Sequence, residues 1–148
     1  MRIFVDADAC PKAIKEIICN LARRTSIEII FVTNQFITLP TLPNLRLLQV
    51  SRGFDVADDE IVKQLVAGDL VISNDIPLAS QVIAKGGTTI NNTGKIYTEQ
   101  NIQQHLAMRD LMAHLRDNLQ ATSYSKPFSA QDKTNFSNTL NKWLSEQR

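Results

Sequence analysis

Short apolar segments recur along the first two thirds of the chain, separated by segments with helical spacing. Each apolar run is rich in β-branched or aliphatic residues and is bounded by polar or turn residues, which is typical of buried strands. The pattern predicts strands at residues 2–5, 27–33, 45–50, 70–73 and 88–90, and a short return strand at 95–97 after a turn.

Helical periodicity fills the segments between these strands. Apolar residues recur at i, i+3, i+4 and i+7 in the first segment, and the second repeats the pattern on a shorter scale. The helices are predicted around Ile14–Leu21, around Ile61–Leu65 and at residues 77–84.

The last third predicts two longer helices. Thr98 is suited to be the N-cap of the first, whose apolar positions are Ile102, Leu106, Leu111, Met112 and Leu115. A polar loop at 120–127 follows. Ser129 and Asp132 resemble a capping box at the start of the second helix, whose apolar stripe is Phe136, Leu140, Trp143 and Leu144.

Alternating strands and helices predict an α/β fold of three layers, with a mainly parallel sheet between helices on both faces. We expect one domain over residues 1–148, with the two C-terminal helices packed onto the sheet. Right-handed crossovers place the loops after the strands at one edge, where such sheets bind ligands. The longest early loop, residues 34–44, is expected to be flexible.

Charge changes this picture little. Sixteen Lys and Arg residues balance fifteen Asp and Glu residues, so binding of a polyanion would require a local basic patch.

Cys10 and Cys19 fall in or beside the first helix, too far apart for a disulfide, and are expected to be thiols. No segment has the length and apolar character of a signal peptide or a membrane span, so we expect a cytoplasmic protein with no membrane partner.

Aspartates follow the predicted strands. Asp6 and Asp8 come at the end of the first strand and point the same way if the chain stays extended there. Asp75 follows the fourth strand. Asp55 and Asp58 share a helical face with the apolar positions of the second helix. Three loops therefore bring carboxylates to one edge of the sheet.

The repulsion among carboxylates in such a cluster must be offset by another group. Two carboxylates 4 Å apart repel by about 4 kcal/mol at an effective dielectric constant of 20. Oxygen ligands of this kind suit Mg²⁺ or Mn²⁺. Each of Asp8, Asp55 and Asp75 could instead be only a helix cap that complements the helix dipole. Capping accounts less well for the whole set than for any one member.

At these residues the sequence resembles the bacterial YaiI/YqxD family, also called UPF0178 or DUF188, which looks like a branch of the PIN-like nucleases. The resemblance spans nearly the whole chain and rests on VDADACP at 5–11, GFDVAD at 53–58, GDLVI at 68–72, DIPLA at 75–79, YT at 97–98, AMRD at 107–110 and PFS at 127–129.

The resemblance implies a PIN-like fold with an acidic, metal-dependent nuclease pocket. Asp6 matches the PIN-like acid after the first strand, and Asp75 matches the acid of the Thr-x-Asp element, with Ser73 in place of the threonine. The middle acid of that pattern is usually Glu on a helix. Here the candidates for it are Asp55, Asp58, Asp59 and Glu60.

We therefore expect hydrolysis of a phosphodiester, in RNA rather than DNA, with Mg²⁺ or Mn²⁺. The expected catalytic residues are Asp6, Asp8, Asp58 and Asp75; the expected metal ligands are Asp6, Asp55, Asp58 and Asp75; and the expected substrate contacts are Lys12, Arg52 and Ser73.

Two alternatives remain open. A haloacid-dehalogenase-like phosphatase would use Asp6-x-Asp8 and a Thr such as Thr33, but its paired acids would have to be Asp69 and Asp75, which flank a strand. The third possibility is a non-catalytic domain that binds a nucleic acid or another partner. The oligomeric state is left open by the sequence.

Overall fold

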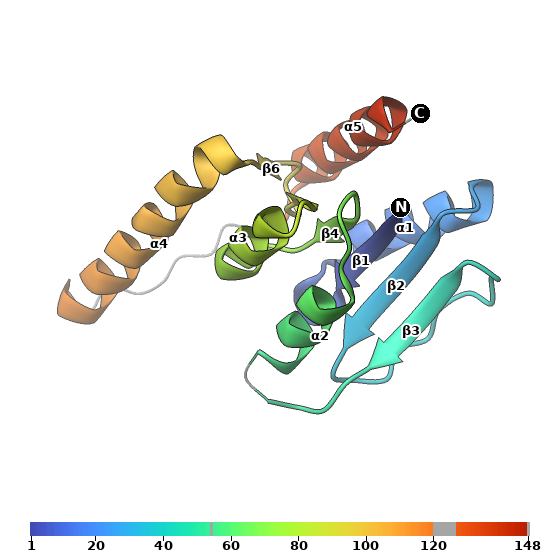
Figure 1. Ribbon diagram of the computed structural model, residues 1–148, viewed down its shortest axis with the longest axis horizontal. Helices are drawn as coiled ribbons and strands as arrows, with labels where there is room; N and C mark the ends of the chain where they lie inside the picture. The colour runs from blue at the N-terminus through green and yellow to red at the C-terminus, as the bar shows by residue number, and fades with distance from the viewer. Residues whose placement is uncertain (54, 120–126, 148) are drawn as a thin grey trace.

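The fold is a six-stranded sheet with helices on both faces (Figure 1). A computed structural model describes residues 1–53, 55–119 and 127–147. The strands are β1 (Arg2–Asp6), β2 (Glu28–Thr33), β3 (Leu45–Gln49), β4 (Leu70–Ile72), β5 (Thr88–Ile90) and β6 (Ile96–Tyr97). The helices are α1 (Lys12–Arg24), α2 (Val56–Gln64), α3 (Ile76–Ala84), α4 (Glu99–Leu119) and α5 (Ala130–Glu146), with a 3-10 turn, η1, at Ala7–Ala9.

The strand order is β3-β2-β1-β4-β5-β6, and every neighbouring pair is parallel except β5 with β6. β1 is central and pairs along its length with β2, from Arg2 opposite Glu28 to Asp6 opposite Val32. The sheet order reverses between β1 and β4, because β2 and β3 extend it one way and β4 to β6 the other. The predicted α/β fold with a mainly parallel sheet is confirmed.

Alternate residues of the central strands feed two separate cores, as expected for a sheet covered on both faces. On one face, Ile3, Val5 and Phe31 contact the apolar stripes of α1 and α5. On the other face, Phe4 and Ile30 contact α2 and α3. The capping box of Ser129 and Asp132 begins α5 as predicted.

The C-terminal helices differ from the prediction. α5 contacts α1 and β5, but α4 packs mainly against α3 and extends away from the sheet (Figure 1). Ile102 is buried there with Tyr97 and Ala79. The later apolar positions of α4 are exposed, because the helix outruns the short α3 that it covers: Met108, Leu111, Met112 and Leu115. The predicted loop at 120–127 lies outside the described residues except for Pro127.

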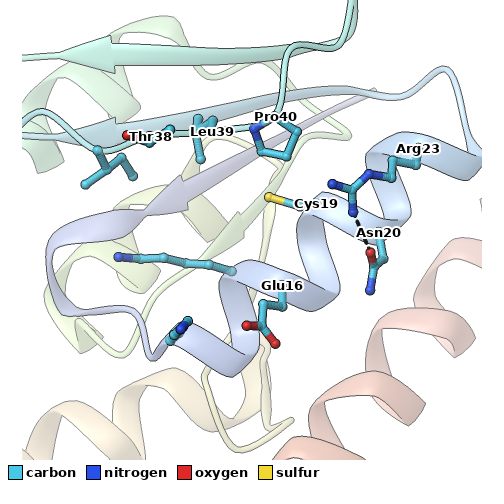
Figure 2. Close-up of a pocket in the computed structure, with 10 residues that line it drawn as sticks. Glu16, Cys19, Asn20, Arg23, Thr38, Leu39 and Pro40 are labelled. Atoms are coloured by element: carbon cyan, nitrogen blue, oxygen red, sulfur yellow. Dashed lines mark hydrogen bonds between the residues drawn. The ribbon is translucent and has the colours of Figure 1, made fainter.

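The crossover at residues 34–44, which we expected to be flexible, contacts the rest of the structure at several points. Ile37, Leu39 and Leu42 pack against the core on the α1 side. The side-chain amide of Asn44 donates to the carbonyl oxygens of Ala22, Thr25 and Ile27, at 3.0, 3.0 and 2.9 Å. Figure 2 shows the middle of this crossover lying opposite α1, with the Cys19 sulfur directed toward it.

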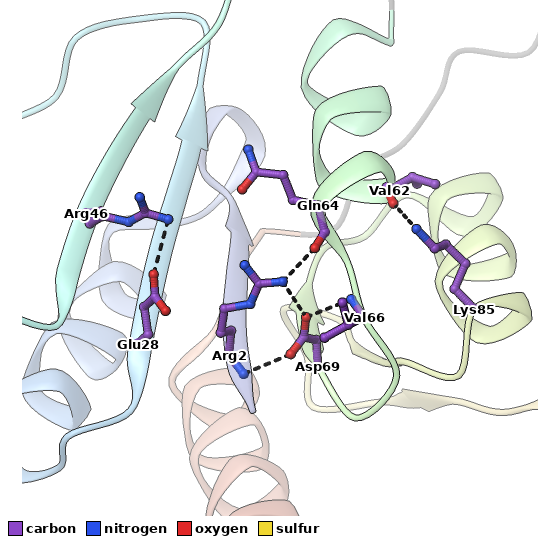
Figure 3. Close-up of polar contacts among 8 residues, drawn as sticks. All are labelled: Arg2, Glu28, Arg46, Val62, Gln64, Val66, Asp69 and Lys85. Carbon is purple, nitrogen blue, oxygen red and sulfur yellow. Dashed lines mark hydrogen bonds and ion pairs between the residues drawn. The ribbon is translucent and has the colours of Figure 1, made fainter.

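The amino edge of the sheet is held by a buried charge (Figure 3). Asp69, which is 1% exposed, accepts hydrogen bonds from the backbone N–H groups of Arg2 (3.0 Å) and Val66 (3.0 Å). The Arg2 guanidinium donates to the same carboxylate at 3.2 Å. Asp69 therefore ties the start of β1 to the loop before β4, at the edge opposite Asp75.

We predict that Asp69→Ala lowers the free energy of unfolding by about 3 kcal/mol, because it removes the charged partner of the half-buried Arg2 guanidinium and leaves two backbone donors without their acceptor. Glu28→Ala is the matched control. It breaks the exposed ion pair with Arg46, 3.1 Å long, and should cost roughly 0.5 kcal/mol or less. Urea unfolding measures both. Equal losses would show that the Asp69 contacts add nothing beyond a surface pair.

Candidate functional site

The carboxyl ends of β1 and β4 lie side by side because these strands pair in parallel, with Val5 opposite Ile72. Asp6 ends β1, and Ser73 follows β4. The Ser73 hydroxyl donates to Asp6 Oδ2 at 2.9 Å, and the backbone N–H of Asp75 donates to the Ser73 oxygen at 3.0 Å. Ser73 is 2% exposed and orients Asp6 while it braces the turn to Asp75.

Asp75 is the N-cap of α3. Its Oδ1 accepts the backbone N–H of Leu78 at 2.9 Å, and Pro77 occupies the first turn, where a missing N–H costs nothing. The capping interpretation of Asp75 is thus correct, but the cap uses only one of the two carboxylate oxygens.

Asp55 and Asp58 approach from α2. Asp55 stands at the N-cap with a left-handed backbone (φ 62°), a conformation that Asp tolerates better than most residues. Its side chain caps nothing, so its carboxylate is available. Asp58 lies in the first turn of α2.

The acids from β1, α2 and α3 act on one another. Burial raises the pKa of Asp58 to about 7, together with a hydrogen bond to Asp75 and the charges of Asp75, Asp6 and Asp55. Burial also raises the pKa of Asp6; the Ser73 hydrogen bond lowers it, and the charges of Asp75 and Asp8 raise it further. Three of the predicted site residues, Asp6, Asp58 and Asp75, therefore form one electrostatic unit.

Asp8 turns away from this unit. The chain does not stay extended after β1; η1 follows at once and directs Asp8 toward the end of β2. Asp8 accepts a short hydrogen bond from the Thr33 hydroxyl, and the N–H of Asn34 donates to its Oδ2 at 3.0 Å. Asp8 thus ties two strand ends together, and sequence reasoning missed its partners.

A small cavity of about 180 Å³ adjoins the acids. Its lining adds Arg109 of α4, and Gln81 of α3, which sequence reasoning did not place there, to the acids Asp55, Asp58, Asp59 and Asp75. The Arg109 guanidinium also lies 3.8 Å from the carboxylate of Asp110. The AMRD motif at 107–110 was the available signal.

Two other predicted substrate contacts, Lys12 and Arg52, do not line this cavity. Lys12 is exposed and lines a separate cavity between α1 and the 34–44 crossover, and Arg52 is exposed before α2. Burial raises the pKa of Cys10 to about 12; Lys15 lowers it and Asp6 raises it. Cys10 is therefore a neutral thiol at pH 7 rather than a nucleophile.

The donor set fits a magnesium-like ion. In the described part of the chain, no three His, Cys, Asp or Glu side chains form a ready coordination shell. Mg²⁺ commonly uses only one or two protein carboxylates and keeps several waters, so a pair such as Asp58 and Asp75, with Asp6 nearby, has suitable chemistry. A divalent ion would also offset the repulsion that raises the pKa of Asp58.

The structure argues against the phosphatase alternative, because the two acids that it would pair lie at opposite edges of the sheet. Asp69 is buried at the amino edge with Arg2, and Asp75 lies at the carboxyl edge. β4 separates the two residues, so they cannot bind one ion.

Fold and site together define an α/β protein with acids gathered where the order of a mainly parallel sheet reverses. The chain belongs to the YaiI/YqxD family: the DUF188 family model, described as "Uncharacterized BCR, YaiI/YqxD family", matches residues 4–146. No solved structure is significantly similar to the chain. In the described residues, no helix has both the length and the apolar character needed to cross a bilayer.

Relatives of the same length support the assignment. A UPF0178 protein of Maridesulfovibrio salexigens is 49% identical over 97% of this chain and 95% of its own length. A UPF0178 protein of Chromobacterium violaceum is 46% identical over 99% of this chain and 100% of its own length. A UPF0178 protein of Cellvibrio japonicus is 49% identical over 100% of this chain and 99% of its own length.

We predict that Asp58→Asn changes the pH dependence of stability. The pKa of Asp58 is raised from 3.8 to about 7, so the folded state holds this proton more tightly than the unfolded state does. Its ionisation therefore lowers the stability of the wild type as pH rises from about 4 to about 7.

The Asn variant cannot ionise at this position, so its stability relative to wild type should rise across that window and level off above it. Urea unfolding at pH 4.5 and 8 measures the difference. Asp59→Asn, the exposed neighbour in the same helical turn, is the control. The same Asp58→Asn effect at both pH values would contradict the assignment.

Proposed function

We propose that this protein is a divalent-metal-dependent nuclease that hydrolyses phosphodiesters, with RNA as the favoured substrate. The observation that carries the proposal is the mutual electrostatic effect of Asp6, Asp58 and Asp75, which come from three different loops. An acid that only caps a helix does not need other acids beside it. Acids placed so close that they raise one another's pKa are characteristic of functional sites.

Asp6 and Asp75 would hold Mg²⁺ or Mn²⁺, with Asp58 or Asp55 completing the site. When bound, such an ion lowers the pKa of a coordinated water and offsets the charge of the attacked phosphate. Ser73 keeps Asp6 oriented through its 2.9 Å hydrogen bond. Asp58, whose carboxyl exchanges its proton near neutral pH, is suited to accept a proton from the attacking water.

Arg109 supplies the positive charge that the acids lack. It lines the same 180 Å³ cavity and is the only basic residue among the described ones that line it. A guanidinium there can donate two hydrogen bonds to the non-bridging oxygens of a phosphate. Asp8 holds the ends of β1 and β2 through Thr33 and Asn34, so we assign it a positioning role.

The test incubates purified protein and Mn²⁺ with single-stranded RNA, single-stranded DNA and a phosphomonoester. We predict cleavage of RNA, at least 100-fold slower in Asp6→Asn and in Asp75→Asn, because each change removes a ligand of the reacting centre. Asp110→Asn, which alters an exposed carboxylate beside Arg109, is the control and should retain activity.

Cleavage that survives both ligand substitutions belongs to a contaminating nuclease. Release of phosphate from the monoester alone would favour a phosphatase. No turnover of any substrate, with retained binding of RNA, would favour the non-catalytic alternative.

Metal binding has its own test. After removal of metal with a chelator, millimolar Mn²⁺ at pH 7.5 should raise the melting temperature by roughly 5 °C, because a ligand that binds only the folded state stabilises it. Asp75→Asn should lose most of this shift, and Glu28→Gln, an exposed carboxylate at the opposite edge of the sheet, should keep it. An equal shift in all three proteins would place the ion elsewhere.

A further inference from the structure

The positive charge of this nearly neutral chain is concentrated on α1. This helix carries Lys12, Lys15, Arg23 and Arg24 against one acid, Glu16, which is a net charge of +3. The whole chain carries +1, so everything outside α1 sums to −2. Any surface that attracts a polyanion is therefore most favourable along this helix.

The helix dipole does not explain this arrangement. Arg23 and Arg24 lie in the last turn, where basic residues complement the dipole. Lys12 and Lys15 lie at the opposite end, where a positive charge opposes it, and the first turn holds no acid. The two lysines thus stand where intrinsic helix electrostatics disfavour them.

These basic residues border a groove. A cavity of about 520 Å³ lies between α1 and the 34–44 crossover. Its α1 side is lined by Lys12, Lys15 and Arg23 together with one acid, Glu16, and its other side by residues 37–40. Figure 2 shows Glu16 and Arg23 on α1 and Pro40 on the crossover. Arg23 also lines a second cavity of about 620 Å³, which continues past Arg24 to the end of α5. From Lys12 to Arg23 the helix rises roughly 16 Å, enough for several nucleotides.

The groove begins at the carboxyl edge of the sheet, which it shares with the acidic site, although the groove lies on the α1 face and the 180 Å³ cavity lies on the α2–α3 face. α1 starts six residues after Asp6, and the crossover starts at Asn34, whose N–H holds Asp8. Phe36, directly before the lining residues, is 75% exposed, the most exposed large apolar side chain among the described residues. An exposed ring beside a basic groove is the combination that binds single-stranded nucleic acid, since bases stack on aromatic rings and phosphates pair with Lys and Arg.

We infer that the α1 groove, between Lys12, Lys15 and Arg23 on one side and residues 36–40 on the other, binds a single-stranded nucleic acid that extends from the acidic site. The inference deepens the proposed nuclease function and rests on it for the identity of the bound polymer. Phosphates lie along α1, and one base stacks on Phe36.

The test measures fluorescence anisotropy of a labelled, unstructured 12-nucleotide RNA with the full chain in EDTA, which prevents metal-dependent cleavage. Lys15→Gln/Arg23→Gln should weaken binding about ten-fold at low salt and reduce the slope of log K against log salt by about 1.4, two phosphate contacts at about 0.7 each. Lys63→Gln/Lys133→Gln changes the net charge equally on α2 and α5 and should stay within about two-fold of wild type.

Phe36→Ala should weaken binding roughly ten-fold without changing the salt slope, because stacking releases no counterions. The inference is overturned if the wild type does not bind the RNA, if both double variants weaken binding equally, or if a duplex of the same length binds as tightly as the single strand.

Hydrolysis of bis(p-nitrophenyl) phosphate separates this inference from the proposed function. This small diester does not reach the groove, so Lys15→Gln/Arg23→Gln should cleave it at the wild-type rate but cleave the 12-mer more slowly at subsaturating RNA. Groove-dependent RNA binding without hydrolysis of any diester would support the inference and contradict the nuclease proposal. Hydrolysis of the diester, with RNA binding unaffected by the groove variants, would support the nuclease proposal and contradict the inference.

Discussion

The parallel pairing of β1 with β2 on one side and β4 on the other is the constraint on which the rest of this structure depends. Parallel strands all end at the same edge, so every residue that follows β1, β2 or β4 is delivered there. Ser73 meets Asp6, and Thr33 meets Asp8, for this reason, although the partners are far apart in the chain. The reversal of the sheet order between β1 and β4 also opens the place where α/β sheets bind ligands.

The acids at this edge have structural and electrostatic roles together. Asp75 caps α3 with one oxygen, yet it also contributes to the pKa of about 7 at Asp58. Ser73 supplies Asp6 with a donor, which partly offsets the cost of burying that carboxylate. The arrangement leaves a repulsion that the protein side chains do not cancel, and a divalent ion is the simplest group that would cancel it.

Periodicity predicted the strands, the helices and the sheet class because each buried face repeats along the sequence. It could not predict where α4 would pack, since an apolar stripe such as Leu111 and Met112 does not specify its partner. At the site, strand-end position identified Asp6 and Asp75. The 3-10 turn that diverts Asp8 left no local signal. The AMRD motif marked Arg109, but the packing of α4 that brings this residue to the cavity depends on tertiary contacts.

Charge is divided between two surfaces: acidic residues line a 180 Å³ cavity on the α2–α3 face of the sheet, and the basic residues of α1 border a groove on the opposite face. The central claim is that the acids form one coupled, cation-binding unit. Carbon-13 NMR titration of the Asp58 carboxyl tests it most directly, with and without Mg²⁺. The account predicts a midpoint near pH 7 in metal-free protein and a midpoint at least about one pH unit lower with saturating Mg²⁺. A midpoint near 4 that Mg²⁺ does not change would contradict it.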